Sequence, residues 1–185
     1  MNKKATSTII INAAKEEYQK RGYPATEVDH IIKRAKVSKE EFDEQFSSLE
    51  DCCLKVLKNH AQEMKRILKK YDENDNCRQR LSLFLDDLYE NAESLSNEGH
   101  PIFNLYYDVR SSDNELSATA SEILKMMHEW LDEQFIIMLK TEAAVDQGDR
   151  LMAAVSGLLL IAKLTGDAQM FKNQLLQLRS WIRSM

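Results

Sequence analysis

The stretch TEVDHIIKRAKVSKEEFDEQF, residues 26–46, carries the pattern that decides the fold. Its first half has apolar residues at helical spacing, and a brief turn then precedes Ser38. Ser38 and Glu41 match a capping box, in which each side chain accepts a hydrogen bond from the other residue's backbone amide. Two short helices joined by so brief a turn predict a helix-turn-helix.

The flanking sequence predicts helices only. An amphipathic segment ends at Gly22, with Thr26 as a candidate cap for the next helix, and a longer helical stripe covers about residues 48–71. Further helical segments follow, interrupted at residues 146–149, and none alternates with period two for long. We therefore predict an all-α protein of about nine helices. A three-helix helix-turn-helix head would occupy residues 1–50, and a six-helix C-terminal body would occupy residues 51–185.

Composition narrows the class of protein. The chain has 185 residues, a net charge of −5 and three cysteines, which argues against a disulfide scaffold and for a cytoplasmic location. No apolar run approaches the roughly 20 residues that span a bilayer, so we expect no membrane partner. No phosphate loop or catalytic motif is present, and the four histidines are scattered, so we expect no enzyme, cofactor or metal. Vicinal Cys52 and Cys53 leave oxidant sensing open as a lesser alternative.

Residues 9–56 resemble the TetR-like family of bacterial transcriptional regulators. The matching residues are Ile10, Ile11, Ala13, Ala14, Tyr18, Arg21, Gly22, Tyr23, Thr26, Val28, Ile31, Ala35, Val37, Ser38, Lys39, Phe46 and Glu50. The resemblance implies a ligand-responsive, dimeric regulator that binds double-stranded DNA, with repression as the expected action. It also implies that the first three helices contact DNA and that residues 51–185 form a ligand-binding and dimerisation domain, in which the next four helices enclose a ligand and the last two form the homodimer.

Four departures from the family pattern concern DNA contact. Lys36 replaces the turn glycine, Glu40 a small residue, Asp43 a tyrosine and Leu49 a lysine. The stretch from Ser38 to Phe46 carries one positive and four negative charges, and carboxylates near phosphates repel them. The alternative function is therefore a TetR-type fold whose acidic recognition helix no longer binds DNA and serves as a protein–protein interaction module.

The candidate site residues fall into three groups. The DNA-binding candidates are Lys3 and Lys4, as a flexible arm, with Thr26, Lys36, Ser38, Lys39 and Gln45. The resemblance assigns a pocket for a small apolar or aromatic ligand to Met64, Phe84, Leu88, Phe103, Tyr107, Met127, Trp130 and Leu131, for which plain core packing is the alternative. It assigns the dimer interface to Leu151, Val155, Leu158, Leu159, Phe171, Leu175, Leu178 and Trp181, for which burial within the same chain is the alternative.

Overall fold

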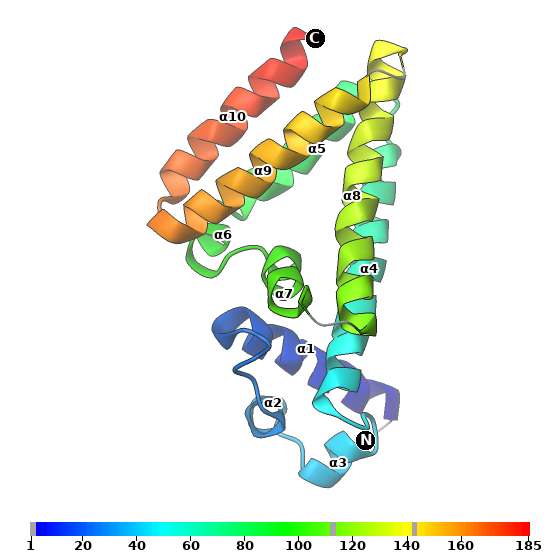
Figure 1. Ribbon diagram of the computed structural model, residues 1–185, viewed down its shortest axis with the longest axis vertical. Coiled ribbons are helices and arrows are strands. Elements are labelled where there is room, and N and C mark those ends of the chain that lie inside the picture. Colours follow the sequence, from blue (N-terminus) through cyan, green and yellow to red (C-terminus); the bar gives the residue numbers. More distant parts are fainter. Residues whose placement is uncertain (1–2, 112–113, 142–143) are drawn as a thin grey trace. The chain divides into compact units, whose positions relative to one another are not determined.

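A computed structural model describes residues 3–111, 114–141 and 144–185 of the chain (Figure 1). The described residues form helices and no strand, which confirms the predicted all-α class. In chain order the helices are α1 (Lys3–Arg21), α2 (Val28–Ala35), α3 (Lys39–Asp43), α4 (Leu49–Asp72), α5 (Cys77–Glu90), α6 (Ala92–Glu98), α7 (Pro101–Val109), α8 (Glu115–Leu139), α9 (Val145–Thr165) and α10 (Ala168–Ser184). None of these helices is long and apolar enough to cross a bilayer.

The chain divides into two compact units, and each is described by itself. The first comprises Met1–Glu63 and Pro101–Ile123, and the second comprises Met64–His100 and Leu124–Met185. The division into a head of residues 1–50 and a body of residues 51–185 stays a prediction.

The first unit is built around α1, which packs against α2, α3 and α7. Apolar residues that recur every three or four positions place one stripe of α1 inside, as the helical period requires. The buried apolar side chains contributed by the first four helices and the segments between them are Ile10, Ala13, Ala14, Tyr18, Ile31, Phe42, Phe46, Cys52, Cys53, Val56 and Leu57. This shared core is what holds the short helices α2 and α3, which would not be stable alone.

In the second unit α10 packs against α5, α6 and α9, and α6 also packs against α9. The segment predicted as one helix around Leu81 to Leu95 is divided at Asn91, where α5 ends and α6 begins. A polar network lies among the helices: the Trp130 indole donates to Asp72 at 3.0 Å, and Arg80 donates to the buried Gln134 at 3.1 Å.

The predicted interruption at residues 146–149 is wrong, because α9 begins at Val145 and includes them. Gly148 is a helix residue at a close approach of two backbones. A Cβ on Gly148 would lie 2.0 Å from Asp132 Oδ1 and 3.0 Å from the Asp132 Cα on α8. The glycine therefore serves packing of α9 against α8, which a sequence pattern reads as a loop signal.

Candidate nucleic-acid interface

The turn between α2 and α3 has the geometry that a helix-turn-helix requires. Lys36 ends α2 in the left-handed region, at φ 55° and ψ 43°, and its amide donates to the Ile32 carbonyl. The predicted capping box is confirmed: the Ser38 amide donates to the Glu41 carboxylate at 2.8 Å, and the Glu41 amide donates to the Ser38 hydroxyl at 3.2 Å. These contacts fix where α3 starts and how it leaves the turn.

Strain at Lys36 gives a testable prediction. A non-glycine residue in the left-handed region destabilises the folded state by about 1–2 kcal/mol, and glycine relieves that strain. Glycine also makes the unfolded chain more flexible, which lowers stability by about 0.5–1 kcal/mol. Lys36→Gly should therefore raise the free energy of unfolding by about 0.5–1 kcal/mol, measured by urea unfolding. The matched control is Lys33→Gly, which removes the same charge inside α2 and should lower stability by about 1 kcal/mol. A loss of stability in Lys36→Gly would show that its backbone is not strained.

The outward face of α3 is acidic. Phe42 is buried, whereas Lys39, Glu40, Asp43 and Glu44 are exposed. Lys39, the only base on this face, forms an ion pair with Asp43 one turn later. The pKa of Glu40 is lowered, chiefly because its carboxylate accepts a hydrogen bond from its own amide and another from Ser38, so Glu40 is ionised at neutral pH. An approaching phosphate would therefore meet a face with excess negative charge.

The start of α4 continues this acidic surface. The Ser48 hydroxyl accepts from the Asp51 amide at 3.1 Å, and the Asp51 carboxylate accepts from the Ser47 amide at 3.1 Å. Glu50 is exposed and accepts from Asn114 at 2.9 Å. Carboxylates in a first turn stabilise the positive end of the helix dipole, but they also occupy the end where a phosphate would bind.

The exposed bases of the head are few. Among the described residues of α1 to α3, Lys20 on α1, Lys33 on α2 and Lys36 in the turn are exposed and form no ion pair. Arg34 pairs with Glu16 at 2.6 Å and with Glu17, so its charge is already compensated. The uncompensated positive charge of α2 and of the turn that follows it therefore lies at Lys33 and Lys36.

Glu17 on α1 is the charged residue that fixes α2 to α1. It is only 3% exposed, and it accepts hydrogen bonds from Arg21 at 2.7 Å and from Arg34 on α2. Burial alone would raise the pKa of Glu17, but hydrogen bonds and charge from Arg34 and Arg21 outweigh it and hold this pKa below its ordinary value. The sequence offered one signal for this network, the i, i+4 spacing of Glu17 and Arg21, whereas Arg34 is 17 residues away.

The DNA-binding candidates are placed as follows. Lys36, Ser38 and Lys39 come together at the turn, and Gln45 is half-buried just after α3. Thr26 is buried and donates to the Gly22 carbonyl at 2.7 Å, so the expectation that it caps α2 is wrong; Glu27 takes that position. Lys3 and Lys4 belong to the first turn of α1, which begins at Lys3. Contact with DNA stays a prediction for all seven candidates.

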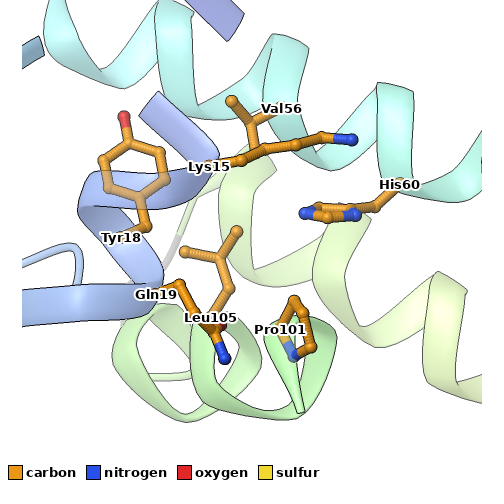
Figure 2. Close-up of a pocket in the computed structure, with 7 residues that line it drawn as sticks. All are labelled: Lys15, Tyr18, Gln19, Val56, His60, Pro101 and Leu105. Carbon is orange, nitrogen blue, oxygen red and sulfur yellow. The ribbon is translucent and has the colours of Figure 1, made fainter. Parts of the chain in front are cut away.

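A small pocket lies inside the first unit (Figure 2). About 10 Å³ of space, enough for a single water molecule, is present between α1, α4 and α7. Its lining residues are Lys15, Tyr18, Gln19, Val56, His60, Pro101 and Leu105, as Figure 2 shows. Burial, and then the charge of Lys15, lower the pKa of His60 to about 4, so this imidazole is neutral at pH 7. None of the residues predicted to bind a ligand lines this pocket.

The predicted ligand residues are distributed over both units. Phe103 and Tyr107 belong to the first unit, where Phe103 is buried and Tyr107 is 50% exposed. The other six are buried in the second unit: Met64, Phe84, Leu88, Met127, Trp130 and Leu131. There the Trp130 ring lies 5.7 Å from the Tyr71 ring and 6.3 Å from the Phe84 ring, centroid to centroid. Their role in ligand binding stays a prediction.

The predicted dimer residues are mostly inside the second unit. Five are buried within their own chain: Leu151, Val155, Leu159, Phe171 and Leu175. Leu158, Leu178 and Trp181 are half-buried. The exposed large apolar residues of the same two helices are Val145, Leu160, Ile161 and Leu164 on α9 and Leu176 on α10, which the sequence pattern did not single out.

The vicinal cysteines are poorly suited to oxidant sensing. Cys52 and Cys53 have no exposed surface, and burial raises the pKa of the Cys52 thiol to about 12 and raises that of Cys53 as well. Because the thiolate is the reactive form, both thiols are inert at neutral pH and act as small core residues.

Comparison with known proteins agrees with this geometry. Residues 10–55 match the family model described as bacterial regulatory proteins, tetR family. A relative from Lactococcus lactis subsp. lactis, described as an uncharacterized HTH-type transcriptional regulator in the lacX 3' region, is 22% identical over 177 residues, which cover 93% of this chain and 90% of the relative.

Two solved structures have the same fold. A TetR-family transcriptional regulator from Agrobacterium tumefaciens has a TM-score of 0.86 and 16% identity, covering 97% of this chain and 98% of its own. A TetR transcriptional regulator from Legionella pneumophila has a TM-score of 0.83 and 20% identity, covering 95% of this chain and 94% of its own. The helix-turn-helix of residues 10–55 therefore matches the tetR family of bacterial regulatory proteins, and the all-α fold of the chain is the fold of these two TetR-family structures.

Proposed function

We propose that this protein is a dimeric, ligand-responsive regulator that binds double-stranded DNA in the cytoplasm and represses transcription. The observation that carries the proposal is the α2–turn–α3 geometry, with a capped α3 whose outward face is exposed rather than packed. Lys33 and Lys36 supply phosphate contacts, and the polar face of α3 reads base edges, where a glutamate accepts from cytosine. We propose no catalytic activity for it.

The direct test is binding to a fluorescent duplex library. Fluorescence anisotropy at about 50 and 200 mM salt covers the range in which phosphate contacts weaken most visibly. Sequence-selective binding that falls steeply with salt is expected, because each neutralised phosphate contributes about 0.9 to the slope. Absence of binding at the lower salt concentration would contradict the proposal.

The exposed apolar residues of α9 and α10 support the dimer. Leu160, Ile161 and Leu164 lie within about one helical turn, with Leu164 81% exposed, and Leu176 on α10 is also exposed. A Cβ on the neighbouring Gly157 would meet nothing within 4 Å. Contiguous apolar surface of this kind marks an association face, and a second copy of the same two helices would cover it in a two-fold contact.

This dimer gives a prediction for mass. The double variant Leu160→Glu with Leu164→Glu should shift the particle from the mass of two chains towards one chain of 21.4 kDa, measured by light scattering after size exclusion. Burying two carboxylates against apolar surface is strongly unfavourable. Gln62→Glu, at an exposed position of α4, is the control and should stay dimeric. A dimer that survives the double variant would place the interface elsewhere.

For the ligand, we propose a small apolar or aromatic molecule held by the second unit's aromatic cluster, defined as Tyr71, Phe84 and Trp130. Asp72 and Asp87 hold the Trp130 indole and the Tyr71 hydroxyl by hydrogen bonds and so supply polar groups beside the rings. Apolar walls with a few placed polar groups are the usual composition of a ligand site.

A second candidate function follows from the acidic surface of α3. Because Asp43 pairs with Lys39, the α3 face has no uncompensated base, and a basic protein segment would suit it better than phosphate. The same anisotropy experiment separates the two functions: an interaction module shows no duplex binding at low salt, and it captures a basic partner instead.

A further inference from the structure

The first turns of α9 and the middle of α8 bring together one imidazole and two carboxylates. His128 and Asp132 lie one turn apart on α8, so they share a face of the helix. Asp149 comes from α9, and its carboxylate lies 2.6 Å from His128 Nε2. The Asp132 carboxylate lies 3.7 Å from the same nitrogen. All three residues belong to the second unit, and one donor atom from each lies within 4.8 Å of the others.

The surroundings of Asp132 distinguish this cluster from a solvated acidic face. Asp132 Oδ1 is shut off from solvent, yet no hydrogen-bond donor reaches it among the described residues. Gly148 is the reason it is enclosed, because the missing Cβ lets the α9 backbone lie directly against Asp132. A buried carboxylate oxygen without a donor is costly, and a cation is the partner that would satisfy it.

We propose that His128, Asp132 and Asp149 form a binding site for a first-row divalent cation, such as Zn²⁺ or Mn²⁺. One imidazole nitrogen with two carboxylate oxygens suits these borderline ions, and three protein ligands leave room for water. The site does not depend on DNA binding. When occupied, it fastens the start of α9 to α8.

The distances fit with one small adjustment. Ligands about 2.1 Å from a tetrahedral ion lie about 3.4 Å from one another. The 3.7 Å separation of His128 Nε2 and Asp132 Oδ1 is close to that value. The 2.6 Å contact with Asp149 is a hydrogen bond that the ion replaces, and the Asp149 side chain, 62% exposed, is free to rotate outwards.

The test is calorimetric titration of the full-length, chelator-treated protein with ZnCl2, MnCl2 and, for comparison, MgCl2. Cys77 is half-buried and its thiol is a competing zinc ligand, so all proteins carry Cys77→Ser. One Zn²⁺ or Mn²⁺ per chain is expected, with Mg²⁺ much weaker because imidazole is a poor ligand for it. His128→Gln and Asp149→Asn should each weaken binding by at least about tenfold, the minimum loss expected even for groups behind the ligands.

Asp146→Asn is the matched control. It removes the same charge from the first turn of α9, at an exposed position outside the cluster, and should leave the affinity unchanged. Both ligand variants change exposed or half-exposed side chains, so folding should persist and is checked by circular dichroism. The proposal is overturned if the parent protein takes up neither Zn²⁺ nor Mn²⁺, or if His128→Gln and Asp149→Asn bind as tightly as the control.

Discussion

The triple variant Glu40→Gly, Asp43→Tyr and Leu49→Lys should bind a non-specific duplex about 100-fold more tightly than the parent at about 50 mM salt. Two carboxylates leave the exposed surface and one base is added, which changes the charge by three units. Each such charge is worth about 1 kcal/mol at contact range in water, and 1.4 kcal/mol corresponds to tenfold in affinity. Losing Asp43 also releases Lys39 from its ion pair. Anisotropy at two salt concentrations measures both the gain and a steeper salt slope.

The control for that variant makes the same change in charge elsewhere. Glu73→Gln, Asp75→Asn and Glu90→Gln alter three exposed residues of the second unit. Long-range attraction alone is screened over about 10 Å, so this control should change the affinity only slightly. Equal gains in the two variants would show that α3 and the start of α4 have no special position relative to the duplex. The affinity of the parent separates the regulator from the interaction module.

The second large effect concerns Glu17→Gln, which should destabilise the first unit by about 1.5–3 kcal/mol, the range for hydrogen bonds to a charged group. The substitution leaves Arg21 and Arg34 without the buried carboxylate that compensates them both. Urea unfolding followed by circular dichroism measures the loss. Glu16→Gln is the control, because Glu16 is mostly exposed and pairs with the same Arg34; exposed pairs are worth under about 1 kcal/mol.

The difference in stability between the parent protein and Glu17→Gln should depend on pH. Because the pKa of folded Glu17 lies below its ordinary value of 4.5, its stabilisation is fully present above pH 4.5 and is lost as the pH falls towards the lowered value. The difference in unfolding free energy between parent and Glu17→Gln should therefore shrink as the solution is acidified below pH 4.5. A difference that stays constant would mean that packing, rather than charge, makes Glu17 important.

Features whose parts lie close in sequence could be predicted. Ser38 and Glu41 are three residues apart, so their box can be read directly from the sequence, and the structure has it. The left-handed conformation of Lys36 is what the resemblance implies, because Lys36 stands where the family has its turn glycine. Local geometry decides both, and no distant residue is needed.

Features that depend on distant partners could not be predicted. Arg34 reaches Glu17 only because α2 packs on α1, and Asp149 meets His128 only because α9 lies against α8. Gly148 shows the same limit, because the sequence does not distinguish a glycine needed for close helix packing from a glycine in a loop. The helix α9 is apolar over more than one stripe. Its sequence alone therefore does not say which stripe is buried within the same chain and which stays exposed.

For the DNA-binding regulator proposed above, the self-compensated surface of α3 would affect how many molecules a cell needs. A chromosome presents roughly a million to a billion competing non-specific sites, and ordinary basic heads spend most of their time on them. A head whose recognition-helix lysine is already paired with Asp43 has little to hold it there. At a given operator affinity, more of the population then stays unbound and available. Full occupancy of a promoter is thus reached at a lower copy number.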